Sequence, residues 1–279
     1  MSEAIKQIGI FKYDDSPTTM QYGYHYNAKL KVPFDSEERI IRVWLPEDYD
    51  FLNQEKKFPV LYFSDGQNLV NKNLTAFGDW GLDQVVHDLI INCNISFIAV
   101  GIDSPKNDEK RSDELNPPYV PKRYKKMKPK GDLFVDFIAE ELKPIIDETF
   151  YTKKEKKYTG IGGSSMGGIM AFYGGVRKPN IFGFSLDFSP AFFLYRKKEW
   201  KGLLESFNIK KEDGVKYYLY VGGKKFERQF VSLTKFTYIY LQDKGFSNNA
   251  KFVFDKKGIH HEDYWHKHLG DAILFWLLD

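Results

Sequence analysis

The chain alternates between short apolar runs and longer stretches in which apolar residues recur every three or four positions. Short runs rich in branched and aromatic side chains are typical of strands, whereas the longer spacing is typical of amphipathic helices. Strands are therefore expected at residues 39–45, 58–64, 96–102, 157–161, 184–188, 216–221 and 251–254. Helices are expected at residues 82–92, 133–150, 165–177, 227–244 and 263–278.

The order of these elements predicts the fold class. Several strand runs, such as 58–63, are apolar on both alternating faces, as strands covered by helices on both sides should be. Strands and helices that take turns predict an α/β fold with a mostly parallel central sheet, and residues 22–46 are typical of an antiparallel hairpin at its N-terminal edge. No linker rich in Pro, Gly or Ser divides the chain, so we expect one domain over residues 1–279, with an inserted loop at 104–130.

Composition and charge limit the partners and the cellular location that are expected. The 279 residues carry 41 Lys and Arg against 38 Asp and Glu, a net charge of +3 that does not favour nucleic acid as a partner. The first residues lack the apolar core of a signal peptide, and no apolar run is long enough for a bilayer, so no membrane association is expected. One cysteine, Cys93, cannot form an internal disulfide, which fits a reducing compartment. We predict a cytoplasmic protein, with its oligomeric state open.

Residues 163–167 read Gly-Ser-Ser-Met-Gly, between an expected strand and an expected helix. This matches Gly-x-Ser-x-Gly, the sharp strand-to-helix turn that lifts a serine hydroxyl above a sheet. The spacing centres the motif on Ser165 and not on Ser164. A plain glycine-rich turn is the alternative.

A serine nucleophile needs a histidine base, and in this arrangement the histidine follows a late strand. His260 comes shortly after the expected strand at 251–254. Because four of the six histidines lie within 260–268, a metal site is the rival interpretation. The zinc pattern His-Glu-x-x-His fails, since Trp265 stands where its second histidine belongs. We predict neither a metal nor a cofactor.

The acid that completes a triad should follow the strand that precedes the histidine-bearing strand in the sequence. Glu227 is the first carboxylate after the expected strand at 216–221. It also begins a helix, where an acid is favoured without any catalytic role. Asp187, Asp255 and a Ser-His dyad with no dedicated acid stay open as alternatives.

Two backbone N–H groups are expected to hold the oxyanion. One belongs to Met166, directly after the predicted nucleophile, and the other to Gln67, in the loop after the expected strand at 58–64. Gly66 is expected to let the chain turn there. An ordinary Asp-Gly turn is the alternative.

In order along the chain, these residues resemble the esterase family of α/β hydrolases that includes esterase D, the feruloyl esterases, the mycolyltransferases and the enterochelin esterases. The resemblance runs from about residue 40 to the C-terminus and rests on short ordered motifs: Phe58-Pro59-Val60-Leu61-Tyr62, Asp65-Gly66-Gln67-Asn68, Trp80-Gly81-Leu82-Asp83, Ala99-Val100-Gly101-Ile102-Asp103 with Arg111 and Glu114, Glu141-Leu142-Lys143-Pro144, Gly163-Ser164-Ser165-Met166-Gly167-Gly168, Ser189-Pro190, and His260 five residues before Trp265.

The resemblance implies an α/β-hydrolase fold and a serine esterase that forms an acyl-serine intermediate. It places the nucleophile on Ser165 and the base on His260. The family's acid maps near Glu227, although Lys224, Lys225 and Phe226 come first here. A non-catalytic relative that binds a ligand or partner, an acyltransferase and a thioesterase are the alternative functions.

The substrate is predicted only as a small-molecule ester. Trp80, Phe192 and Phe193 are candidates for the wall of its pocket, and Arg111 for a contact with it. Because aromatic residues make up 17% of the chain, a place in the core is the alternative for the aromatic three. Residues 122–130 carry six cations and no acid, which suits a polyanionic ester such as a catecholate siderophore, or a solvated basic loop.

Overall fold

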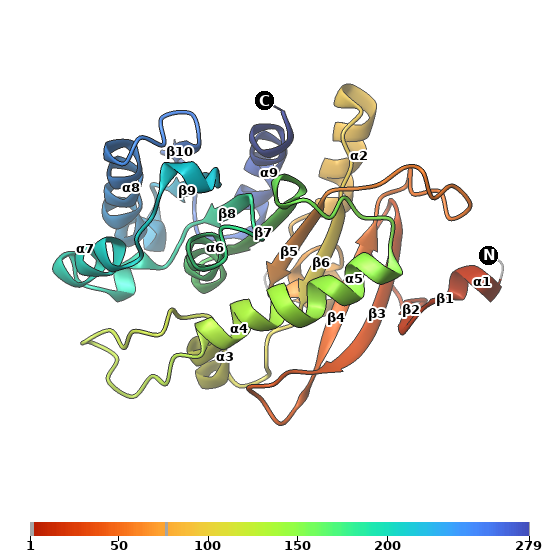
Figure 1. Cartoon of the computed structure of the whole chain (residues 1–279), viewed down its shortest axis with the longest axis horizontal. Helices are drawn as coiled ribbons and strands as arrows, with labels where there is room; N and C mark the ends of the chain where they lie inside the picture. Colours follow the sequence, from red (N-terminus) through yellow and green to blue (C-terminus); the bar gives the residue numbers. More distant parts are fainter. Residues whose placement is uncertain (1–2, 76–77, 279) are drawn as a thin grey trace. The chain divides into compact units, whose positions relative to one another are not determined.

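The computed structural model describes residues 3–75 and 78–278. Contacts divide the chain into two compact units, each built from separate segments (Figure 1). The first unit comprises residues 1–104, 137–159 and 261–279, and the second comprises residues 105–136 and 160–260. The expectation of one domain over 1–279 stays a prediction.

Six strands of the first unit lie in the order β1-β2-β3-β4-β6-β5. The pairs from β1 through to β6 are antiparallel, and β5 and β6 are parallel. Their bounds are β1 Gln7–Ile8, β2 Phe11–Tyr13, β3 Tyr24–Lys31, β4 Glu38–Leu45, β5 Val60–Ser64 and β6 Ile98–Ile102. The pairing of β3 with β4 confirms the hairpin expected at 22–46.

The first unit also carries helices and short helical turns. They are α1 Glu3–Lys6, η1 Gly66–Asn68, η2 Lys72–Leu74, α2 Leu82–Cys93, the π-helical segment η3 Phe137–Leu142, α5 Lys143–Thr149, η4 Lys156–Tyr158 and α9 Glu262–Leu277. Helices α2 and α9 pack against each other.

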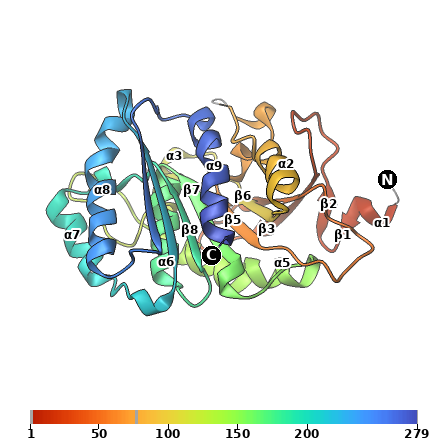
Figure 2. The same ribbon diagram turned by 90° about the horizontal axis from the view of Figure 1, so that it is seen from above.

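Four parallel strands form the sheet of the second unit, in the order β7-β8-β9-β10. They are β7 Thr159–Ser164, β8 Phe184–Phe188, β9 Lys216–Gly222 and β10 Ala250–Asp255. The helical elements are α3 Asp108–Glu114, α4 Gly131–Asp136, α6 Met166–Arg177, η5 Phe192–Leu194, α7 Lys197–Ser206, η6 Lys211–Asp213, η7 Lys225–Glu227 and α8 Arg228–Asp243. In Figure 2, α8 runs alongside β9 and β10.

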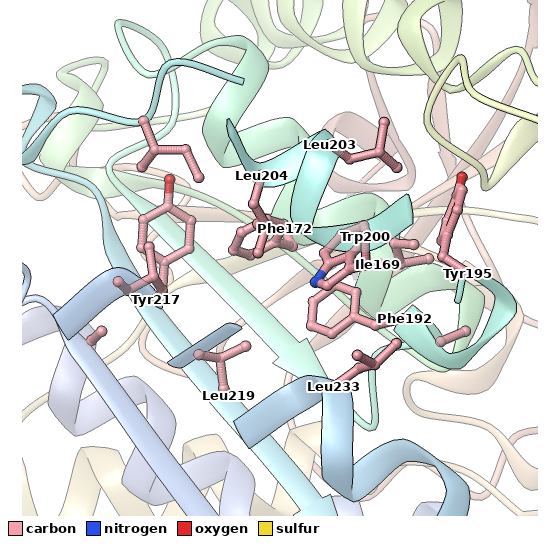
Figure 3. Close-up of a cluster of buried hydrophobic side chains, with 14 of the residues drawn as sticks. Ile169, Phe172, Phe192, Tyr195, Trp200, Leu203, Leu204, Tyr217, Leu219 and Leu233 are labelled. Atoms are coloured by element: carbon pink, nitrogen blue, oxygen red, sulfur yellow. The ribbon is translucent and has the colours of Figure 1, made fainter. Parts of the chain in front are cut away.

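One face of this parallel sheet is covered by α6, α7 and α8 (Figure 3). Trp200 on α7 is fully buried at the centre of the cluster, and Phe172 on α6 and Tyr217 on β9 lie around it. Burial of each such side chain contributes roughly 2 kcal/mol relative to exposure. This packing holds α6 and α8 against the strands whose ends carry the predicted site residues.

Candidate active site

Ser165 stands at a sharp turn between β7 and α6. Its φ of 59° is rare for a residue with a side chain, and its ψ is −115°. Ser164 ends β7 and is buried, whereas Ser165 is half-buried. The turn therefore leaves Ser165, on which the motif is centred, more exposed than Ser164.

At Gly168, in the first turn of α6, the helix comes close to the end of β8. A Cβ at this position would lie 2.8 Å from the carbonyl oxygen of Phe188 and 3.0 Å from Cα of Pro190. Both are backbone atoms that cannot move aside cheaply. Glycine is thus required here for the helix to start where it does.

The four parallel strands bring four polar residues to one edge of the sheet. Ser165 directly follows β7, Ser189 directly follows β8, and Glu227 and His260 follow β9 and β10 within a short loop. The carboxyl ends of adjacent parallel strands meet at the same edge, the usual location of ligand sites in α/β sheets. The strand order thus groups residues that lie far apart in the sequence.

Glu227 and His260 form a hydrogen-bonded pair. The Nδ1 atom of His260 lies 3.1 Å from Oε1 of Glu227. The Glu227 side chain is fully buried, whereas 19% of the His260 side chain is exposed. A buried carboxylate bound to Nδ1 fixes the orientation of the ring.

The alternative acids make other contacts. Asp187 is fully buried in β8, where Ser185 donates a hydrogen bond of 2.5 Å to it. Burial raises the pKa of the Asp187 carboxyl well above its usual range, and the bond from Ser185 opposes that rise. Asp255 accepts the backbone N–H of Lys257 at the turn after β10. Of the three carboxylates considered from the sequence, Glu227 is the one paired with His260.

Two phenylalanine rings flank the imidazole of His260. The ring of Phe230, on α8, is stacked at a centroid distance of 4.8 Å. The ring of Phe226 meets it edge-on at 5.2 Å and is 55% exposed. Sequence reasoning did not select either residue, although both flank the predicted acid closely in the sequence. These two phenylalanines reach the imidazole because Glu227, which lies between them in the sequence, pairs with His260.

The segment after β8 links Ser165 to the Glu227–His260 pair. The backbone N–H of Ser165 donates to the oxygen of Phe188, and the N–H of Ala191 donates to the oxygen of Ser165, both at 2.9 Å. Between these two bonds lies Ser189, whose hydroxyl donates to Oε1 of Glu227. The segment 188–191 is thus hydrogen-bonded to Ser165 at both ends and to Glu227 through Ser189.

The two residues predicted to hold an oxyanion follow β7 and β5. Met166 is the first residue of α6 in the second unit, where a backbone N–H has no acceptor within its own helix. Gln67 lies in η1 of the first unit, and its side chain bonds Ser104 through Nε2 and Oε1. Their shared role stays a prediction.

Gly66 has a different role from the one expected. The left-handed residue is Asp65, with a φ of 56°, and a Cβ on Gly66 would lie 2.5 Å from the carbonyl carbon of Gly101. Glycine therefore permits the close approach of η1 to β6, and Asp65 makes the turn.

Trp80 and Phe192 do not form exposed pocket walls. Trp80 is 3% exposed and packs against Phe63 and Trp265. Phe192 is fully buried and stacks on Trp200. Both are core residues, because other aromatic rings cover them.

Phe193 and Arg111 are more accessible. Phe193 is partly buried, and its ring lies 6.1 Å from that of Phe226 and 4.6 Å from that of Phe230. It therefore belongs to the aromatic group around His260. Arg111 is a half-buried residue of α3. Their contact with substrate stays a prediction.

The predicted insertion contains α3 and the basic segment at 122–130. All six cations of that segment except Lys130 are exposed, and Lys130 is half-buried. The segment is tied down at both ends, by the N–H of Lys122 bonding Glu199 and the N–H of Lys128 bonding Asp113. Ser112, in α3, lies 3.8 Å from the sulfur of Met166, so α3 lies beside the start of α6.

Among residues 3–75 and 78–278, no group of three His, Cys, Asp or Glu side chains is arranged to hold a metal ion. His261 instead caps α9 by accepting the N–H of Asp263, and His266 bonds the backbone oxygen of Trp80. Within the same described ranges, none of the helices has the length and apolar character needed to cross a bilayer.

Comparison with known proteins supplies relatives over nearly the whole chain. A curated relative is the uncharacterized protein YbbA of Bacillus subtilis strain 168, 23% identical over 86% of this chain and 92% of its own. The ferulic acid esterase AmCE1/Fae1A of Anaeromyces mucronatus has a TM-score of 0.68 at 21% identity, covering 98% of this chain and 99% of that one.

The enterobactin esterase FES of Shigella flexneri, solved in the presence of enterobactin, is a third similar protein. Its TM-score is 0.70 at 17% identity, and the match covers 94% of this chain and 60% of that one. At these identities the two solved structures establish the shared α/β-hydrolase fold, with its mostly parallel sheet and antiparallel N-terminal strands.

The family is established by a separate match, which spans residues 36–276 and is described as "Putative esterase". It covers both units and every residue predicted for the site. The chain therefore belongs to the "Putative esterase" family and is a carboxylic ester hydrolase.

Proposed function

We propose that the chain is a serine esterase with Ser165 as nucleophile, His260 as general base and Glu227 as the acid that orients the base. The observation that carries this proposal is the hydrogen bond of 3.1 Å between His260 and the buried Glu227. Glu227 and His260 follow the adjacent parallel strands β9 and β10, and Ser165 follows β7 of the same sheet. A solvated or purely structural histidine does not require a fully buried carboxylate partner.

The proposed reaction is acyl transfer to water in two steps. The hydroxyl oxygen of Ser165 attacks the ester carbonyl while Nε2 of His260 takes its proton, and the backbone N–H groups of Met166 and Gln67 hold the oxyanion. Collapse of this intermediate breaks the ester C–O bond, and His260 gives the proton to the departing alkoxide. Water then attacks the acyl-serine with the same assistance, releasing the acid and restoring Ser165.

The electrostatics of the pair suit this chemistry. Glu227 stabilises the imidazolium that forms when His260 accepts the proton from Ser165. The kcat/KM for ester hydrolysis should fall at acid pH, because a protonated imidazole cannot take the proton of Ser165. A rate that stays flat down to pH 5 would contradict a histidine base.

The substrate class follows only from the relatives. Their names refer to ferulic acid and to enterobactin, so we propose a small-molecule ester and would screen aromatic, sugar and siderophore esters first. Acyl transfer to an alcohol and thioester hydrolysis use the same residues, and product analysis with added acceptors separates them. The expected cytoplasmic location stays a prediction, to be tested by fractionation.

The first experiment is hydrolysis of p-nitrophenyl acetate, butyrate and octanoate by the wild type, Ser165→Ala and Ser164→Ala. We expect a loss of several orders of magnitude in Ser165→Ala, about 10³-fold or more. Ser164→Ala is the matched control, since this neighbour ends the strand, and it should stay within about threefold of wild type.

Fluorophosphonate labelling provides a test that needs no suitable ester. The reagent should label Ser165 in the wild type and in Ser164→Ala, but not in Ser165→Ala. A wild-type protein that is neither active nor labelled would instead favour a non-catalytic relative that binds a ligand or partner.

A further inference from the structure

Ser189 is a second serine of the candidate site, and the sequence analysis gave it no role. It follows β8 directly and is fully buried. Its hydroxyl donates a hydrogen bond to Oε1 of Glu227, the same oxygen that faces Nδ1 of His260. Two donors from separate elements therefore meet on one carboxylate oxygen.

The other carboxylate oxygen of Glu227 differs in its hydrogen bonding. Oε2 is buried, and no side chain or backbone group of the described residues donates a hydrogen bond to it. A buried carboxylate is costly unless hydrogen bonds compensate its lost hydration. The bond from Ser189 therefore matters for the orientation of Glu227.

The backbone conformation of Ser189 supports a role for its side chain. Its φ is 45°, in the left-handed region where glycine is favoured over a residue with a Cβ. Its backbone N–H donates to the oxygen of Tyr220 on β9 at 2.7 Å, which fixes this conformation beside the strand that leads to Glu227. Backbone energy alone would favour glycine, so the hydroxyl is the reason for a serine here.

We propose that Ser189 is a positioning residue that holds Oε1 of Glu227 towards Nδ1 of His260. This inference rests on the proposed function of Ser165, His260 and Glu227. Ser189 acts through Glu227 and does not touch the reacting ester. Its loss should slow proton transfer by His260 and leave binding of the ester nearly unchanged.

Ser189→Gly is the informative variant, because it removes the hydroxyl and suits the positive φ. Ser189→Ala removes the same group and retains the backbone strain. We expect both to lower kcat for p-nitrophenyl butyrate about 10- to 100-fold, as for loss of a hydrogen bond to a charged group. KM should change less than about threefold, because the residue does not contact substrate.

A double-mutant cycle separates this role from a structural one. If Ser189 acts through Glu227, Ser189→Gly should cost less than about threefold in a Glu227→Ala background. Both variants leave in place the rings of Phe226 and Phe230 beside His260.

Proton NMR gives a readout without any substrate. The proton on Nδ1 of His260 should give a low-field resonance in the wild type that shifts or broadens in Ser189→Gly. A wild-type kcat in Ser189→Gly, an equal loss in the Glu227→Ala background, or an unmoved resonance would each overturn the inference. If fluorophosphonate labels wild-type Ser165 in the same preparation, only this inference has failed; if it does not, the proposed function itself has failed.

Discussion

The Nδ1 atom of His260 lies 3.1 Å from Oε1 of Glu227, and the glutamate side chain is fully buried. A carboxylate held against one ring nitrogen fixes the orientation of the imidazole. The two residues lie 33 positions apart in the sequence, and the parallel pairing of β9 with β10 brings them together.

Glu227→Gln tests the acid directly. The amide retains the size of the side chain but loses its charge and favours the wrong tautomer of His260, so kcat should fall about 10²- to 10⁴-fold. Asp255→Asn is the control, because Asp255 accepts the N–H of Lys257 in the turn after β10, and the activity of this variant should stay within about threefold. Steady-state kinetics on p-nitrophenyl butyrate would decide, and the reverse ranking of the two variants would make Asp255 the acid.

Gly168→Ala should disturb the turn at Ser165, although Gly168 is not one of the predicted site residues. The added Cβ would lie 2.8 Å from a backbone oxygen of Phe188, so α6 must move away from β8. We expect a loss of about 1–3 kcal/mol in the free energy of unfolding by urea denaturation, with a drop in kcat because Ser165 moves with the helix.

Gly202→Ala is the matched control for that substitution. Gly202 lies within α7, and a Cβ there meets no atom within 4 Å. Alanine should therefore stabilise the protein by about 0.5–1 kcal/mol through the higher helix propensity of alanine, with activity unchanged. Equal stability of the two variants would mean that the close approach at Gly168 is absent in solution.

Most of the periodic elements were predicted from the sequence, and the roles of the residues carried by a motif stay predictions. The strand expected at 184–188 matches β8, and the acid inferred from chain order is the one that bonds His260. The helix α7 was missed because Lys197–Ser206 carries only three buried side chains among charged ones. Its apolar positions, Trp200, Leu203 and Leu204, nevertheless follow helical spacing.

Other features depend on contacts that no local pattern encodes. Phe192 and Phe193 are neighbours of the same type, yet one is fully buried and the other is partly buried beside the aromatic group around His260. The bond from Ser189 to Glu227 joins residues 38 positions apart through the ends of β8 and β9. Such tertiary pairs become visible only when the strand order is known.

Glu262 predicts a pH dependence of stability. Burial raises the pKa of its carboxyl to about 7, and nearby Asp263, Asp65 and Asp79 add to the rise. Since the folded pKa lies above the unfolded value, the folded state holds this proton more tightly. Its contribution to stability is therefore fully present below about pH 4.3 and is lost as pH rises to about 7.

Glu262→Gln should remove that dependence. At pH 8 the variant should be more stable than wild type by about 1–3 kcal/mol, and the two should converge near pH 4. Asp263→Asn is the comparison: it removes one of the three charges that add to this rise, so it should reduce the slope between pH 4 and 7 without abolishing it. Urea denaturation across this range measures both, and a wild-type slope in Glu262→Gln would assign the dependence to another group.

Phe226 should contact an apolar group of the bound ester. Its ring is 55% exposed, yet it lies 5.2 Å from the ring of His260 and 6.1 Å from that of Phe193, so a bound ester can cover it. Phe226→Ala should raise KM for p-nitrophenyl octanoate about 10-fold, because part of an apolar contact with the bound ester is lost. KM for the acetate should change little. Ile239→Ala, at a comparably exposed position on α8, should change neither KM. An equal fall in kcat on both esters would instead mean that Phe226 serves to hold the imidazole, because a ring that contacts only the longer substrate cannot slow the shorter one.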